Sequence, residues 1–270
     1  MNLLVTLDRN YLPPLRVLLA SLLHSNPDDS FDLYIAHHEL AEQDFAVLAR
    51  GLDGARLHLF PIAVPDEELA GAPVEKRYPR EMYYRLFACR YLPKTLDRIL
   101  YLDPDIVALN SMRMLYNIDL YGAWFAAASH VRAPLQRFNE LRLDLPVGGA
   151  YVNSGVLLMD LEALRRNQDV EQVLTFIREN RVKMMLPDQD VLNALYGDRI
   201  LPINPLIYNL SEKYYTRYNL DLKNQPVDLD WVRHNTVFVH YCGRNKPWRP
   251  GYFGVLDLFY QEYADGSEAK

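Results

Sequence analysis

The sequence is poor in cysteine and contains no long hydrophobic run. Two cysteines, Cys89 and Cys242, occur in 270 residues. Such a low count excludes the disulfide framework of small secreted domains and favours two reduced thiols. The apolar runs, such as residues 156–159, have the length of a buried strand rather than the ~20 residues of a membrane span. The first residues include an acid, Asp8, and show no signal-peptide cleavage pattern. We therefore expect a cytoplasmic protein without an integral membrane segment.

Positive charge is also in short supply. Lys and Arg number 29 against 35 Asp and Glu, which gives a formal net charge of -6. Since no basic face is evident, we expect no nucleic-acid partner. A Gly-x-Gly-x-x-Gly turn is missing as well, which argues against a dinucleotide site. An acidic protein that binds an anionic nucleotide needs a local positive centre, such as a metal ion or a few placed Arg and Lys.

Hydrophobic residues make up 50% of the chain, so a packed core is expected. In the first 60 residues, strand patterns at 2–7, 31–36 and 56–61 alternate with helical patterns at 12–23 and 41–52. This alternation is typical of a parallel sheet with crossover helices and predicts an α/β fold.

The remaining elements follow the same logic. With no internal repeat or linker, we predict a single domain over residues 1–265 and a frayed tail at 266–270. Residues 63–79 are predicted as a loop and 134–146 as a mobile insert. Further strands are predicted at 98–102, 124–128, 155–160 and 237–240, and further helices at 80–91, 169–181, 188–196 and 251–263.

Two carboxylates, Asp103 and Asp105, directly follow the strand at 98–102. Ligands of open α/β sheets bind beyond the carboxyl ends of the strands. Two neighbouring charges there are costly unless a cation lies between them, and a hard divalent ion is the natural partner. A solvated polar turn is the alternative interpretation.

His240 follows another apolar strand and can complete a metal site with two carboxylates. That ligand set suits a transition metal such as Mn²⁺ better than Mg²⁺. Behind it, Gly243 lets backbone approach a ligand and Lys246 offers a point charge for a phosphate. A structural histidine is the alternative.

The first strand ends in a polar segment. Asp8 and Asn10 could hydrogen-bond a base edge and Tyr11 could stack on it, because the first βα turn is a usual nucleotide position. An Asp or Asn helix cap explains the same residues equally well.

Two more polar segments precede a predicted strand and a predicted helix. Residues 153–155 combine small polar side chains with a glycine, which suits a compact polar ligand or a tight turn. In the second segment Asp188 can cap the helix, whereas Gln189 between Asp188 and Asp190 could bind several hydroxyls of a sugar.

Taken in this order, these segments resemble glycosyltransferase family 8, which includes bacterial lipopolysaccharide α-galactosyl- and α-glucosyltransferases and the glycogenins. The resemblance covers residues 2–248. It implies a GT-A fold, a Rossmann-like open mixed sheet flanked by helices. It also implies a UDP-sugar donor, Mn²⁺, retention of anomeric configuration and a role in cell-surface polysaccharide biosynthesis. Members are often dimers, so a homodimer is a further expectation.

The resemblance assigns roles position by position. Leu7 and Arg9 depart from the residues that close relatives often carry in the first motif. Ser154 stands near the donor sugar where relatives often carry Ala, so the sugar stays open between glucose and galactose. The implied roles are Asp103, Asp105 and His240 for Mn²⁺; Asp8, Asn10, Tyr11 and backbone at Thr6 for uridine; Gly243 and Lys246 for the diphosphate; Arg85 for the donor; and Asn153, Ser154, Gly155, Asp188 and Gln189 for the sugar.

For the mechanism we favour attack from the leaving-group face, with Gln189 stabilising the oxocarbenium-like centre. A double displacement would instead need a carboxylate nucleophile such as Asp188 or Asp190. The resemblance implies a glycan or lipid-linked saccharide as acceptor, which the residues themselves do not identify. Its suggested contacts are Tyr78, Arg132 and Tyr214.

Three other functions share parts of this pattern. A UDP-sugar hydrolase would use the same metal site with water as acceptor. A catalytically silent nucleotide-sugar binder would be free to lose one of the metal or phosphate residues, which this chain retains. A nucleotidyltransferase would want a triphosphate-binding loop, and we find none.

Overall fold

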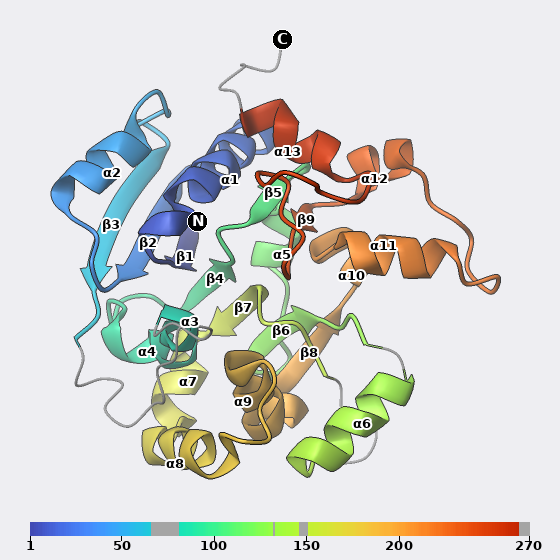
Figure 1. Cartoon of the computed structure of the whole chain (residues 1–270). Coiled ribbons are helices and arrows are strands. Elements are labelled where there is room, and N and C mark those ends of the chain that lie inside the picture. Colours follow the sequence, from blue (N-terminus) through green and yellow to red (C-terminus); the bar gives the residue numbers. More distant parts are fainter. Residues whose placement is uncertain (66–80, 132, 146–150, 265–270) are drawn as a thin grey trace.

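The computed structural model of the chain describes residues 1–65, 81–131, 133–145 and 151–264. Its main sheet has seven strands in the order β3-β2-β1-β4-β7-β6-β8 (Figure 1). Strands β1 to β4 run parallel and β8 is parallel to β6, whereas β7 is antiparallel to both β4 and β6. The bounds are β1 Asn2–Thr6, β2 Phe31–His37, β3 Leu57–Ala63, β4 Arg98–Leu102, β6 Phe125–Ala128, β7 Val156–Asp160 and β8 Ile200–Ile203.

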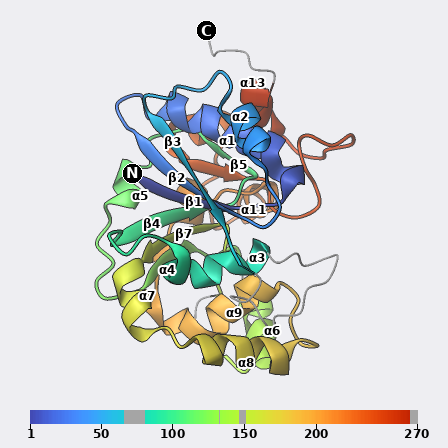
Figure 2. The ribbon, with the colours of Figure 1, turned by 90° about the vertical axis from the view of Figure 1, so that its left-hand side faces the viewer.

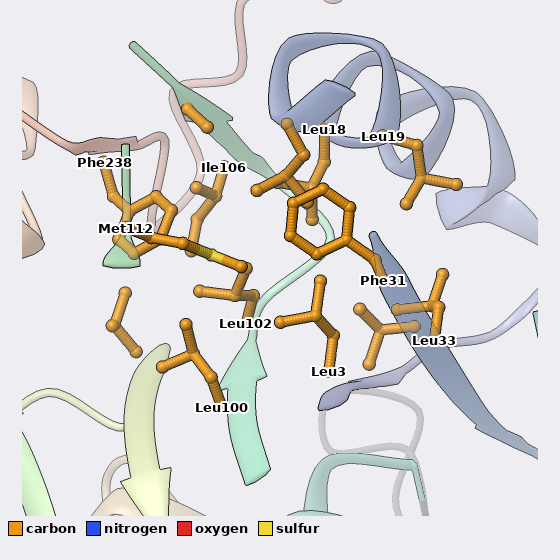
Figure 3. Close-up of a cluster of buried hydrophobic side chains, with 14 of the residues drawn as sticks. Leu3, Leu18, Leu19, Phe31, Leu33, Leu100, Leu102, Ile106, Met112 and Phe238 are labelled. Atoms are coloured by element: carbon orange, nitrogen blue, oxygen red, sulfur yellow. The ribbon is translucent and has the colours of Figure 1, made fainter. Parts of the chain in front are cut away.

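Helices cover both faces of this sheet, with α1 and α2 on one face and α4 and α7 on the other (Figure 2). Side chains alternate between the faces along each strand. In β1, Leu3 and Val5 join the hydrophobic cluster beneath α1, whereas Leu4 joins the cluster on the opposite face. Figure 3 shows Leu3 packed with Leu18 of α1 and Phe31 of β2. The predicted α/β class with an open mixed sheet is confirmed.

The helices begin where their sequences supply caps. Asp160, Asp169 and Asp228 each accept a hydrogen bond from the backbone N–H three residues further on. The helix bounds are α1 Leu12–Ser25, α2 Glu42–Ala49, α3 Glu81–Tyr84, α4 Ala88–Tyr91, α5 Arg113–Tyr116, α6 Ala133–Leu143, α7 Leu161–Asn167, α8 Val170–Asn180, α9 Pro187–Tyr196, α10 Pro205–Tyr208, α11 Glu212–Asn219, α12 Leu229–Asn235 and α13 Asp257–Ala264.

A second, two-stranded sheet joins the middle of the chain to its C-terminal part. It pairs β5 (Ile106–Ala108) with β9 (Phe238–His240), antiparallel and with Ile106 opposite His240. The backbone N–H of Tyr241 also donates to the carbonyl of Asp105 at 3.0 Å. This pairing sets the end of β9 beside the turn that follows β4.

Three predicted elements are wrong in detail. The predicted insert 134–146 is largely helix α6, with Pro134 in its first turn, where proline is tolerated. The predicted helix 80–91 breaks into α3, a 3-10 turn at Arg85–Phe87 and α4. The predicted helix 251–263 begins only at Asp257, because Gly251 and Gly254 have φ values of 82° and 150°.

Several predictions fall wholly or partly outside the described residues. Of the loop 63–79, Ala63 belongs to β3 and residues 66–79 are not described; the tail 266–270 is not described either.

Cys89 and Cys242 are both free. None of the helices in the described ranges combines the length and the apolar character needed to span a bilayer.

Candidate active site

The two predicted carboxylates and the predicted histidine meet at the carboxyl end of β4. Asp103 and Asp105 lie in the turn after β4, and His240 is the last residue of β9. His240 Nε2 lies 3.4 Å from Asp103 Oδ2 and 3.3 Å from Asp105 Oδ1. One ligand atom from each residue lies within 4.8 Å of the others, so the cluster can hold a metal ion.

His240 carries the clearest sign of a ligand site. Among the described residues, only two buried side-chain polar atoms have no hydrogen-bond partner, and His240 Nε2 is one of them. Burial alone would lower the pKa of His240, but the carboxylate of Asp105 raises it to about 10. A buried nitrogen facing two carboxylates at more than 3 Å suits a divalent cation between them.

Gly155 leaves the space that this cluster occupies. A Cβ at this position would lie 2.2 Å from His240 Cε1 and 2.6 Å from Asp103 Oδ2. The Gly155 carbonyl also accepts a hydrogen bond from the Asp103 N–H at 2.8 Å. The residue before β7 therefore packs directly against the metal-type cluster, by which we mean Asp103, Asp105 and His240, and only glycine fits there.

Arg85 balances the carboxylates on one side of the cluster. Its Nη1 lies 2.9 Å from Asp103 Oδ1 and 3.3 Å from Asp188 Oδ2, and donates to the Ser154 carbonyl at 3.0 Å. Burial would raise the pKa of Asp103, but Arg85 and His240 lower it well below its usual range. Asp103 is therefore a carboxylate ready to bind a cation.

Lys246 lies on the other side. Its Nζ bonds the carboxylate of Asp105 and donates to the Tyr241 carbonyl at 2.9 Å. It also lies over the rings of Tyr11, at 5.7 Å, and Trp248, at 5.3 Å. Tyr11, at the exit of β1, and Trp248, after β9, therefore both contact the buried ammonium group of Lys246. A nucleotide site that spans these two segments requires such an arrangement.

The remaining residues of the β1 exit make local contacts. Asp8 accepts from the Asn10 N–H at 2.9 Å and from its side chain at 3.3 Å, which is the predicted capping alternative. The buried Thr6 hydroxyl lies 3.3 Å from the hydroxyl of Tyr101, which in turn donates to Asp103 at 2.5 Å. Capping leaves the polar groups of this exit oriented but does not exclude ligand binding.

The predicted sugar residues also come together. Ser154 Oγ donates to Asp188 Oδ2 at 2.8 Å, and Asn153 Nδ2 donates to Gln189 Oε1 at 3.1 Å. Burial raises the pKa of Asp188. The first turn of α9 therefore lies against residues 153–155, next to the metal-type cluster.

Asp190 differs from its neighbours. Its carboxylate is fully buried and forms two hydrogen bonds of 2.8 Å with Arg142 of α6. It also accepts from the Tyr151 hydroxyl and from the backbone N–H groups of Met185, at 2.7 Å, and Leu186, at 3.1 Å. The Arg142 bonds join α6 to α9, and the five hydrogen bonds together occupy both carboxylate oxygens.

The remaining predicted positions are Gly243 and the suggested acceptor residues. Gly243 lies in an exposed turn with a φ of 88°, in the region that favours glycine. Of the suggested acceptor contacts, Tyr78 and Arg132 lie outside the described residues, and Tyr214 packs against His130 with ring centroids 5.4 Å apart.

Sequence reasoning missed Asn209, which is fully buried and bonds both His240 and Asn153. The available signal was indirect. A metal-binding histidine needs a partner for its second ring nitrogen, but no pattern in the sequence points to position 209.

The sheet, with an acidic metal-type site beyond β4, is the architecture of GT-A glycosyltransferases. The chain spans 97% of each of two solved structures of LgtC. One is an active-site mutant, with a TM-score of 0.83 and 24% identity, and the other is the galactosyltransferase with donor and acceptor sugar analogues, with a TM-score of 0.82 and 25% identity. Both alignments cover the whole of this chain.

The model of the family "Glycosyl transferase family 8" matches residues 2–250, and the chain belongs to this family. A lipopolysaccharide 1,2-glucosyltransferase of Escherichia coli K12 is 30% identical over 249 residues, which are 92% of this chain and 72% of that protein. A lipopolysaccharide 1,3-galactosyltransferase of Salmonella typhimurium is 25% identical over 269 residues, covering 96% and 77%.

Proposed function

We propose that the protein is a retaining hexosyltransferase. It uses Mn²⁺ to move glucose or galactose from a UDP-sugar to a glycan or lipid-linked saccharide. The observation that carries the proposal is the buried His240 Nε2, which has no hydrogen-bond partner and faces Asp103 and Asp105 at the end of β4. The names of the E. coli and Salmonella relatives support a hexose and a saccharide acceptor.

In this proposal the donor lies across the ends of β1, β4 and β9. Its uridine contacts the exit of β1, and its diphosphate lies between the metal ligands and Lys246. The proposed donor-binding residues are Thr6, Asp8, Asn10 and Tyr11 for uridine, Gly243 and Lys246 for the diphosphate, and Arg85, Asn153, Ser154, Gly155, Asp188 and Gln189 for the sugar.

Bound Mn²⁺ would supply Lewis-acid charge to the leaving diphosphate. The chain adds the fixed positive charges of Arg85 and Lys246, which are already buried and oriented. Asp190 is a poor nucleophile in this arrangement, because Arg142, Tyr151 and two backbone N–H groups occupy its oxygens. We therefore favour attack from the leaving-group face, with the Gln189 amide stabilising positive charge at the sugar carbon.

The setting of the enzyme belongs to the proposal too. We take residues 1–265 as one domain, since the seven-stranded sheet draws strands from both halves of the chain. A cytoplasmic location and a homodimer are proposed from the sequence and the family resemblance.

The proposal is tested by turnover. The purified protein is incubated with Mn²⁺ and a panel of UDP-sugars, with and without glucose- and galactose-terminated oligosaccharides, and UDP release and the anomeric proton of the product are followed. We expect acceptor-dependent release from one UDP-hexose and an α-linked product. Release that ignores the acceptor would indicate a hydrolase. Binding without release would indicate a silent binder.

A further inference from the structure

Asn209 is a buried residue with no role in the function proposed above. It is the residue that follows α10, and its side chain touches both a metal-type ligand and a sugar-side residue. We propose that Asn209 is a positioning residue that fixes the tautomer of His240 and, through Asn153, the orientation of the Gln189 amide. This inference rests on the proposed function, because it assigns roles within the same site.

The backbone around Asn209 holds it in place. Its carbonyl accepts from His130 Nε2 at 2.5 Å. The next residue, Leu210, donates to the Phe238 carbonyl at 2.9 Å and accepts from the His240 N–H at 2.7 Å. Asn209 is therefore tied to β9, the strand that carries His240, and both residues are buried.

The orientation of each side-chain amide follows from one backbone group. The Gly155 N–H can only donate, and it donates to Asn153 Oδ1 at 3.0 Å. The Asn209 atom 2.9 Å from that same oxygen must then be its Nδ2 donor. The other Asn209 atom is consequently the Oδ1 acceptor, 2.9 Å from His240 Nδ1.

Two consequences follow at opposite ends of this chain of hydrogen bonds. His240 Nδ1 keeps its proton in its bond to Asn209, so Nε2, which faces Asp103 and Asp105, is the nitrogen that would lose its proton and ligate a metal ion. At the other end, Asn153 Nδ2 donates to Gln189 Oε1, so Asn153 fixes the orientation of the Gln189 amide, whose carbonyl oxygen keeps a second lone pair for the sugar carbon. Asn209 thus orients both the metal ligand His240 and, through Asn153, the sugar-side residue Gln189.

The isosteric variant Asn209→Asp separates the two roles. A carboxylate still accepts from His240 Nδ1 but has no proton to donate to Asn153. We expect Mn²⁺ affinity, measured by electron paramagnetic resonance without donor, to stay within threefold of wild type, whereas UDP release falls at least tenfold. Asn153→Asp, which keeps its acceptor contacts but cannot donate to Gln189, should show the same split.

Asn209→Ala removes both contacts and should weaken Mn²⁺ binding by about 10- to 100-fold as well as turnover. Asn26→Ala is the matched control, because Asn26 is a buried asparagine at the C-terminal end of α1 whose side chain bonds Leu22, Ser25 and Met112 and none of the site residues. It should keep wild-type Mn²⁺ affinity.

Equal loss of affinity and turnover in the two aspartate variants, or wild-type values in all three site variants, would overturn the inference. A wild-type protein that binds neither Mn²⁺ nor a UDP-sugar would instead reject the proposed function.

Discussion

His240 and Asp190 are both buried ionisable side chains, yet their surroundings give them opposite uses. His240 Nε2 has no hydrogen-bond partner and faces two carboxylates. The Asp190 carboxylate accepts from two side chains and two backbone N–H groups. A buried group without a partner is available to a ligand, whereas a fully bonded carboxylate stabilises the fold.

Gly155→Ala tests the close packing at the cluster. The new Cβ would collide with His240 and Asp103, so we expect Mn²⁺ affinity to fall by about 10- to 100-fold, measured by paramagnetic resonance. Gly54→Ala is the control, because a Cβ there meets nothing within 4 Å. Equal affinities in the two variants would contradict the packing argument.

His130 predicts an acid-sensitive stability. Burial lowers its pKa from 6.5 to about 4, so between these values the unfolded chain binds a proton that the folded chain does not. Through His130 the folded chain therefore loses free energy of unfolding as the pH falls. This loss is close to zero at pH 7 and reaches roughly 3 kcal/mol near pH 4.

Urea unfolding of wild type and His130→Gln at pH 7, 5.5 and 4.5 measures this effect. The wild type should lose more stability than the variant as the pH falls. Parallel pH profiles would show that His130 contributes nothing.

At the scale of elements, the carboxylates were predictable because they follow an apolar strand, and strand ends carry ligands in open sheets. The three-residue strand β5 was not predictable, since it exists only through its pairing with β9, which is more than a hundred residues away in the chain. Helix α6 was missed for a similar reason. Its attachment through Arg142 to Asp190 crosses 48 residues and leaves no local pattern.

Arg142→Ala tests that attachment. Removing the guanidinium leaves the Asp190 charge buried and unpaired, so the free energy of unfolding should fall by roughly 3–5 kcal/mol in urea denaturation. Arg166→Ala removes an exposed ion pair with Glu162 and should cost less than about 1 kcal/mol. Similar losses in both variants would mean that the buried pair does not hold α6.

Across the whole molecule, a chain of net charge -6 gathers Arg85, Lys246 and His240 around two carboxylates. Metal that binds only the folded chain must stabilise it. At 100 times its dissociation constant, Mn²⁺ should add about 2.7 kcal/mol to the free energy of unfolding. Thermal unfolding with and without Mn²⁺ measures this gain, and the gain should vanish in Asp105→Asn. An equal gain in that variant would place the metal elsewhere.

The central claim is that Asp103, Asp105 and His240 hold the metal on which donor binding depends. Calorimetric titration with UDP-glucose and UDP-galactose, with and without Mn²⁺, tests it most directly in wild type, Asp103→Asn and the surface control Asp119→Asn. The account predicts binding of at least one UDP-hexose that requires Mn²⁺, survives in the control and is lost in Asp103→Asn. Binding that is indifferent to Mn²⁺ and to Asp103 would contradict it.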